Sequence, residues 1–167
     1  MIPAFVALGS NIEPRLKYLT SAVVQLEKLG TVLKIAPLYR SHPYGVEDQP
    51  DFLNSACILS TNFLPLDFLK ALKDIEKKLG RRKTFRWGPR EIDLDIIFLG
   101  DRIINEEELV IPHPGFRERR FVLLPLVQMD AHFIPPAENR TLKELLNDCS
   151  DETPIKLEED NWYPLWK

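Results

Sequence analysis

Apolar residues near the start of the chain change from strand-like to helix-like spacing. A nearly continuous apolar run at residues 2–8 predicts a buried strand. Apolar residues at i, i+3, i+7 and i+10 from Leu16 then predict an amphipathic helix that ends at Gly30. Ser10 and Glu13 have the spacing of a capping box, so we expect them to begin this helix.

Two strands, a second helix and a further strand are predicted next. Residues 31–39 and 52–61 have strand composition and flank a loop rich in proline, glycine and aspartate. A helix with an apolar stripe is predicted from Pro65 to Gly80, and a strand at 91–99. The order β-α-β-β-α-β predicts a ferredoxin-like α+β fold. Its antiparallel sheet should carry both helices on one face and leave the other face free for a ligand.

The remainder of the chain is less regular. We treat the 167 residues as a single domain, 1–167, with a core of about 1–128 and a C-terminal extension, 129–167. One or two helical turns are predicted at 121–127 and a short helix at 142–146. No element is assigned to 151–167, which has acidic residues and two tryptophans.

The strand from Glu91 to Ile96 alternates strictly between acidic and apolar residues. Successive side chains of a strand point to opposite faces, so the acidic set should face away from the core. Asp93 and Asp95 would have Cα atoms about 6–7 Å apart, close enough for their carboxylates to converge on one or two cations. Mg²⁺ takes such carboxylates together with phosphate oxygens and water. A solvent-exposed acidic strand face would show the same pattern.

Five cationic residues come just before this acidic strand. Arginines and a divalent metal together neutralise the charge of a transferring polyphosphate. The loop could equally be a solvated run of charge, but Trp87 at its centre argues against an idle loop. Trp87 could also be a packing anchor. The five cations are Arg81, Arg82, Lys83, Arg86 and Arg90.

An aromatic ring and an amide share one face of the strand at 52–61. Phe52 offers a surface on which a planar heterocycle can stack, and Asn54 can read its hydrogen-bonding edge. Phe121 could supply a second aromatic face. Both phenylalanines would also suit a hydrophobic core.

Three further polar residues are candidates for the same site. Glu76 lies at the edge of an apolar helix stripe, where it could be a site acid or form an ion pair with an arginine. His113 lies between two prolines and close to several arginines, which favours a phosphate-facing role over a purely structural one. Asn11 could assist the helix start or line the site.

Composition limits the classes of function. The net charge of −3 disfavours a general nucleic-acid binder, which is usually basic. Cys57 and Cys149 have no neighbouring cysteine or histidine that would complete a zinc site. No apolar stretch reaches the length of a membrane span. We therefore expect a cytoplasmic, monomeric protein with no nucleic-acid or membrane partner.

Several motifs together resemble the 6-hydroxymethyl-7,8-dihydropterin pyrophosphokinase family over residues 2–128. The most specific is the R-W-G-P-R-x-x-D-x-D block. The motifs are Ala7–Asn11, Gln49–Asn54, Gly80–Arg82, Arg86–Asp95, Ile111–Pro114 and Arg119–Leu123.

The resemblance implies a ferredoxin-like fold and a step in folate synthesis. ATP would donate its β,γ-pyrophosphate to the hydroxymethyl group of the pterin, giving AMP and the pterin diphosphate. Two Mg²⁺ ions would be held by Asp93 and Asp95. The proton acceptor stays open between Asp93, Asp95 and a metal that lowers the pKa of the hydroxyl.

The resemblance also implies roles for individual residues. The ATP-binding set is Glu76, Arg81, Arg90, Ile96, His113 and Arg119. The pterin-binding set is Asn11, Ser41, His42, Tyr44, Phe52, Asn54 and Phe121. The catalytic set is Arg81, Trp87, Arg90, Asp93 and Asp95.

Two other classes of protein remain as alternatives. A ferredoxin-like RNA-binding module would display aromatic and basic residues on its sheet, whereas this sheet is expected to display Asp93 and Asp95. A two-metal phosphohydrolase would release a nucleotide without a pterin acceptor.

Overall fold

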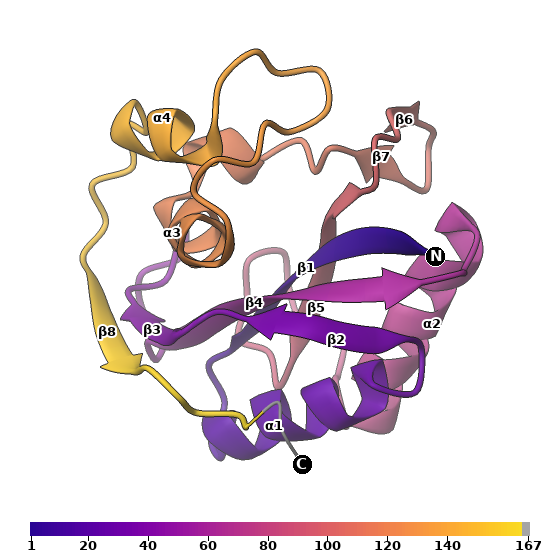
Figure 1. The fold of residues 1–167 in the computed structure, drawn as a ribbon. Helices are drawn as coiled ribbons and strands as arrows, with labels where there is room; N and C mark the ends of the chain where they lie inside the picture. The colour runs from indigo at the N-terminus through magenta and orange to yellow at the C-terminus, as the bar shows by residue number, and fades with distance from the viewer. Residues whose placement is uncertain (165–167) are drawn as a thin grey trace.

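A six-stranded antiparallel sheet forms the centre of the protein in the computed structural model, which describes residues 1–164 (Figure 1). Its strands are β1 (Ile2–Ser10), β2 (Thr31–Ile35), β3 (Leu38–Ser41), β4 (Phe52–Thr61), β5 (Asp93–Leu99) and β8 (Ile155–Glu159). They follow the order β5-β1-β4-β3-β8, and β2 also pairs with β4. The central strands β1 and β4 pair along their full length, while β5 lies at an edge.

Within residues 1–164, four α-helices cover the two faces of the sheet. The crossover helices α1 (Arg15–Leu26) and α2 (Pro65–Lys78) pack on one face, which confirms the ferredoxin-like arrangement. The later helices α3 (Arg120–Met129) and α4 (Leu142–Asn147) pack on the opposite face. A small hairpin, β6 (Ile104–Asn105) with β7 (Val110–Ile111), and a 3₁₀ turn at Phe116–Glu118 join β5 to α3. Within residues 1–164, no helix is long and apolar enough to cross a bilayer.

The sheet buries apolar residues on both faces, so it separates two hydrophobic cores. Along β1, Val6 and its alternate neighbours pack against α1 and α2, whereas Phe5 packs with Phe98 and Phe116 beneath α3. The expectation that the second face is free for a ligand is therefore wrong in part. The segment after residue 115, which includes α3 and α4, covers much of this face, and a pocket lies on the uncovered part.

Two local predictions in the first half of the chain are wrong. Ser10 does not cap a helix, because it is fully buried as the last residue of β1. Helix α1 begins at Arg15, and Pro14 at the N-cap position offers no side-chain acceptor. The strand expected at 31–39 is two strands, β2 and β3, separated at Ala36 and Pro37. Proline has no N–H to donate to a sheet ladder, so it breaks the run.

The C-terminal extension contains an unpredicted strand. β8 adds to the free edge of β3. Beyond it, Trp162 is only 7% exposed, and its Nε1 donates a hydrogen bond of 2.9 Å to the Ala36 carbonyl. Trp166, the second tryptophan of the tail, lies outside the described residues. The predicted helices at 121–127 and 142–146 are confirmed as α3 and α4.

Gly30 lies between α1 and β2, where there is no room for a side chain. A Cβ there would lie 2.2 Å from the Ser60 carbonyl oxygen, which belongs to the central strand β4. Gly30→Ala should therefore lower the free energy of unfolding by about 1–3 kcal/mol through overpacking. Urea denaturation would measure this loss. Val24→Ala, on the exposed side of α1, should change it by less than about 0.5 kcal/mol; equal losses in both variants would contradict the prediction.

Candidate functional site

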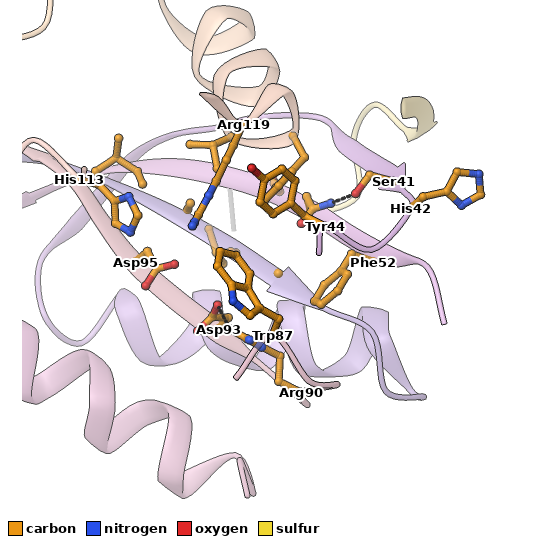
Figure 2. Close-up of a pocket in the computed structure, with 18 residues that line it drawn as sticks. Ser41, His42, Tyr44, Phe52, Trp87, Arg90, Asp93, Asp95, His113 and Arg119 are labelled. Carbon is orange, nitrogen blue, oxygen red and sulfur yellow. Dashed lines mark hydrogen bonds and ion pairs between the residues drawn. The ribbon is translucent and has the colours of Figure 1, made fainter. Parts of the chain in front are cut away.

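A pocket opens on the sheet face that α3 only partly covers (Figure 2). The ends of β1, β3, β4 and β5 form its floor, and the loops before β4 and β5 and the start of α3 form its walls. Segments far apart in sequence thus meet at one place. The lining residues are Ala7, Leu8, Gly9, Ser41, His42, Tyr44, Phe52, Asn54, Ser55, Trp87, Arg90, Asp93, Asp95, Ile97, His113, Arg119, Phe121 and Val122.

Small residues on the central strand make the floor concave. Gly9 of β1 pairs with Asp93 of β5 on one side and with Asn54 of β4 on the other, and Ala7 pairs with Asp95. A Cβ at Gly9 would lie 3.2 Å from the Asn54 Oδ1 atom. The missing side chain therefore leaves a depression between an acidic row on β5 and an amide on β4. Gly9 and Ala7 belong to the Ala7–Asn11 motif, but neither was given a role in the site from the sequence. Their positions opposite Asp93 and Asp95 in the strand pairing would have identified them.

The two aspartates have different surroundings. Asp93 Oδ1 lies 2.8 Å from Arg81 Nη1, and Asp93 Oδ2 lies 2.6 Å from Arg90 Nη1. Burial would raise the pKa of Asp93, but the positive charges of Arg90, Arg81 and Lys73 outweigh it and lower the pKa below its usual value. Asp93 is therefore held as a carboxylate.

Asp95 has neither a hydrogen bond nor an ion pair to any described residue. Burial, followed by the negative charges of Asp93 and Glu76, raises the pKa of Asp95 to about 7. A cation beside Asp95 would relieve both effects. Within residues 1–164, no cluster of three or more histidine, cysteine or acidic side chains could hold a metal. Two carboxylates with further oxygens from a phosphate and water suit Mg²⁺ better than zinc.

Side chains of α2 form hydrogen bonds with the backbone of β5 between the two aspartates, where β5 has no neighbouring strand. Glu76 is 2% exposed, and its Oε1 accepts a 2.7 Å hydrogen bond from the Leu94 N–H. Lys73 Nζ lies 3.0 Å from the same oxygen and 3.4 Å from the Leu94 carbonyl. Glu76 Oε2 lies 2.5 Å from Arg81. Of the two interpretations of Glu76, the structure shows the ion pair with an arginine, and Lys73 was not anticipated.

The far end of the pocket offers a ring and an amide. The Asn54 Nδ2 atom donates a 2.7 Å hydrogen bond to Ser41 Oγ inside the protein. This bond directs the Asn54 Oδ1 atom toward the open space above Gly9. Phe52 stands at the outer end of the same strand, so a planar ligand could meet both an aromatic face and an acceptor.

An aromatic roof lies over this floor. The ring centroid of Tyr44 is 5.5 Å from that of Trp87 and 6.3 Å from that of Phe121. The guanidinium carbon of Arg119 lies 5.2 Å from the Trp87 centroid and 5.7 Å from the Tyr44 centroid. Trp87 has a positive φ of 66°, which turns its ring from the basic loop into the pocket (Figure 2). Arg119 therefore lies against two of the aromatic rings that form this roof.

Asn11 joins the loops around the pocket. Its Nδ2 donates to Gln49 Oε1 and the Pro50 carbonyl, both at 3.0 Å, and its Oδ1 accepts from the Arg90 N–H at 2.8 Å. Gln49, which was not singled out from the sequence, donates in turn to the Trp87 carbonyl at 2.8 Å. These bonds link the basic loop to the loop before β4.

The two histidines of the pocket lining, His113 and His42, occupy different positions. His113 is held beside β5 by a 3.0 Å hydrogen bond from its N–H to the Ile97 carbonyl. Burial and then the charges of Arg119 and Lys73 lower the pKa of His113 to about 4, although Asp93 opposes this, so its ring is neutral at pH 7. His42 is exposed at the pocket rim, with its Nδ1 2.8 Å from Asp51 Oδ1. Figure 2 shows its ring turned away from the pocket centre.

Most of the predicted site residues meet in this pocket, but a few lie beside it. Asn11, Glu76 and Arg81 lie behind or beneath its walls, and the Ile96 side chain packs in the helix-side core. Glu91 was expected to face the same way as the aspartates. Instead it is 8% exposed, precedes β5, and accepts a hydrogen bond from the Arg82 N–H. The residues brought together are Ser41, His42, Tyr44, Phe52, Asn54, Trp87, Arg90, Asp93, Asp95, His113, Arg119 and Phe121.

Comparison with known proteins gives a consistent result. Residues 5–131 match the model of the family described as 7,8-dihydro-6-hydroxymethylpterin-pyrophosphokinase (HPPK). A 2-amino-4-hydroxy-6-hydroxymethyldihydropteridine pyrophosphokinase of Aquifex aeolicus is 38% identical over 144 residues, 86% of this chain and 90% of that protein. The enzyme of the same name from Haemophilus influenzae is 36% identical over 159 residues, 94% and 99% of the two chains. A crystal structure of Plasmodium falciparum HPPK-DHPS with pteroate has the same fold, with a TM-score of 0.72 at 18% identity over 87% of this chain and 42% of that one.

The contacts of Glu76 predict a large structural effect of its removal. Glu76→Ala would leave the buried Leu94 N–H unpaired and Arg81 without one partner. We expect the free energy of unfolding to fall by about 3 kcal/mol, measured by urea denaturation. Asp74→Ala, on the exposed side of the same helix, removes only a 3.9 Å contact with Lys77 and should be nearly neutral. A Glu76→Ala variant as stable as Asp74→Ala would show that the edge of β5 does not need this carboxylate.

Proposed function

The chain belongs to the 7,8-dihydro-6-hydroxymethylpterin pyrophosphokinase family, and we propose that the pocket between β5 and β4 is where its reaction takes place. The protein is an ATP-dependent diphosphotransferase of folate biosynthesis. It transfers the pyrophosphoryl group of ATP to the hydroxymethyl group of 6-hydroxymethyl-7,8-dihydropterin. The assignment to this pocket rests on one observation. One end of the pocket offers aromatic rings and an amide, and the other end is acidic and lined by arginines.

We assign the pterin to the end formed by β3 and β4. Phe52 and Phe121 line the pocket from opposite sides, one from the sheet and one from α3, so a flat ring can lie between them. The Asn54 Oδ1 atom faces the open space and can accept a hydrogen bond from the ring's amide-like N–H or amino group. Ser41 holds that amide in place, while Tyr44 and Trp87 cover the ligand.

We assign the triphosphate to the end formed by β5. Arg90 and Arg119 line the pocket there, and Arg81 lies directly behind Asp93. His113 is neutral and can donate to a phosphate oxygen from whichever ring nitrogen carries its proton. Its Nδ1 already accepts from the Gly115 N–H at 3.2 Å, so the proton belongs on Nε2. Glu76 would then act on ATP indirectly, through Arg81. Ile96 would act through its backbone, because its side chain packs in the helix-side core.

Asp93 and Asp95 would hold Mg²⁺, and we propose two ions. The fit rests on the unpartnered Asp95 carboxylate next to a second carboxylate on the same strand face. When bound, Mg²⁺ would draw negative charge from the phosphate oxygens as a Lewis acid. Glu76 and Lys73 fix the Leu94 backbone between the two aspartates, so the spacing of the carboxylates is set by the protein.

Catalysis in this pocket depends mainly on position and charge. The pterin hydroxyl loses its proton, to Asp93, Asp95 or water, and attacks the β-phosphorus; the bond from that phosphorus to the α,β-bridging oxygen breaks, and AMP leaves with that oxygen. Asn54 and the aromatic residues orient the hydroxymethyl group, while Arg90 and Arg119 offset the charge that develops on the oxygens. Trp87 and Tyr44 form a roof that excludes water, which would otherwise compete with the pterin as acceptor.

The proposed partners follow from the pocket and from the charge of the chain. The net charge of −3 disfavours a nucleic-acid partner, so we propose ATP and the pterin as the ligands of this face. We also propose that the protein acts as a monomer. The use of ATP and the free thiols of Cys57 and Cys149 support a cytoplasmic location.

AMP formation tests the assignment of the reaction. The protein with Mg²⁺ and ATP should release AMP only when 6-hydroxymethyl-7,8-dihydropterin is present, at one AMP per pterin diphosphate. Nucleotide release without the pterin would instead indicate a phosphohydrolase. Chromatographic separation of the nucleotides and pterins distinguishes the two outcomes.

The acidic dyad should be essential for this turnover. Asp93→Ala and Asp95→Ala should each lower Mg²⁺-dependent kcat by at least about 100-fold, because each removes a ligand of the proposed metal ions. Asp101→Ala, just beyond β5 and outside the pocket, serves as the matched control and should keep normal activity. Thermal unfolding should confirm that all three variants fold. Near-normal turnover of both dyad variants at millimolar Mg²⁺ would remove the dyad from the mechanism.

Asn54 should distinguish the two ligands. Asn54→Ala removes the acceptor that faces the pterin but nothing near the triphosphate, so pterin binding should weaken by about 1–3 kcal/mol and ATP binding should hardly change. Isothermal titration with each ligand measures both. Equal losses for pterin and ATP would mean that Asn54 has only a structural role.

A further inference from the structure

The C-terminal tail touches two walls of the pocket although it contributes no lining residue. Figure 1 shows the yellow segment leaving α4, running alongside β3 and ending near α1. It is anchored at Asp151 before β8 and at Trp162 and Tyr163 after it. The whole segment lies beyond the 5–131 stretch that matches the family.

The first contact of the tail is with the strand that carries Ser41. Ser41 pairs with Ile155 in the β3–β8 ladder, and Arg40 pairs with Lys156. The Arg40 guanidinium also binds Glu158 through two contacts, Nε to Oε2 at 2.9 Å and Nη2 to Oε1 at 2.7 Å. β3 is four residues long and leads directly into the loop that carries Tyr44. Without β8 it would be a short edge strand, paired with β4 alone.

The second contact is with the start of α3. The N-cap residue Arg119 makes no side-chain cap, and its carbonyl accepts from the Val122 and Leu123 N–H groups, so the Arg120 N–H needs an acceptor from elsewhere. Asp151 supplies one from the tail, because its Oδ2 accepts a 2.9 Å hydrogen bond from the Arg120 N–H. Its other oxygen accepts from the Thr153 N–H at 3.0 Å, which fixes the carboxylate. Arg120 lies between Arg119 and Phe121, two of the three residues by which the start of α3 reaches the pocket.

We propose that residues 151–159 form a clamp that positions both substrate-facing walls of the pocket, with Asp151 holding the start of α3 and β8 holding β3. This proposal rests on the proposed function for the identity of the two ligands. Asp151, Arg40 and Glu158 are positioning residues, since they act through Ser41, Arg119 and Phe121 without touching a substrate. The anchor at Trp162 ties the clamp to Ala36, where β2 gives way to β3.

The two halves of the clamp predict different binding defects. Arg40→Glu opposes Glu158 and loosens β3, so the Kd for 6-hydroxymethylpterin should rise about tenfold while that for α,β-methylene-ATP with Mg²⁺ stays unchanged. Asp151→Ala frees the start of α3, so both Kd values should rise, because Phe121 faces the pterin and Arg119 faces the triphosphate. Fluorescence titration with each ligand measures the four constants in the full-length protein.

Conservative and compensating variants separate positioning from general damage. Asp151→Asn keeps an acceptor for the Arg120 N–H and should restore both affinities, and the swapped pair R40E/E158R should restore pterin binding. Arg140→Glu disrupts another exposed ion pair of the C-terminal region, with Asp148, and should leave both Kd values unchanged. Amide hydrogen exchange should show faster opening of residues 120–123 in Asp151→Ala and of residues 38–41 in Arg40→Glu.

The outcomes are distinct from those that test the function itself. Wild-type protein that makes no AMP with the pterin present would overturn the proposed function. Active wild-type protein whose Arg40→Glu and Asp151→Ala variants fold and bind both ligands normally would overturn the clamp alone. Should Asp151→Ala fail to fold, Arg40→Glu decides, because an exposed ion pair contributes little to stability. Weaker binding of both ligands by Arg40→Glu, with no recovery in the R40E/E158R variant, would also refute the clamp.

Discussion

The pocket depends on keeping two neighbouring carboxylates on the bare edge strand of a sheet. Asp93 and Asp95 repel each other, and β5 has no strand on its outer side to pair the Leu94 backbone. Glu76 and Lys73 take the place of that missing strand, while Arg81 joins Glu76 to Asp93.

The central strand explains how one face accommodates the two ligands that we propose for it. Gly9 and Ala7 are the residues of β1 that face the pocket, and neither has a side chain that reaches across it. The acidic row on β5 and the amide of Asn54 on β4 therefore face each other over a shallow floor. A larger residue at Gly9 would meet the Asn54 amide and separate the two ends of the pocket.

The parts of this structure that follow from short-range periodicity could be predicted from the sequence. Alternation placed Asp93 and Asp95 on one strand face and Phe52 beside Asn54, and the β-α-β-β-α-β order followed from helical and strand spacing. The capping box at Ser10 failed because tertiary burial in β1 outweighs a local motif. The role of Lys73 and the strand β8 depend on partners far away in the chain, which no local pattern specifies. Asn11 was a candidate from its place after the first strand and from the motif resemblance, and the structure shows it bracing loops outside the pocket lining.

The arginines of the basic loop illustrate how the site can accept a highly charged ligand at modest cost. Arg81 and Arg90 already neutralise Asp93, and both lie next to the surface assigned to the triphosphate. The proposed function therefore allows an exchange of partners: Asp93 would hold Mg²⁺, and the Arg81 and Arg90 guanidinium groups would pair with phosphate oxygens. No new unpaired charge has to be buried in this exchange, which matters because burying one costs several kcal/mol. Since Arg81 also keeps its contact with the buried Glu76, it can turn only a short way, and the new position of its guanidinium remains defined.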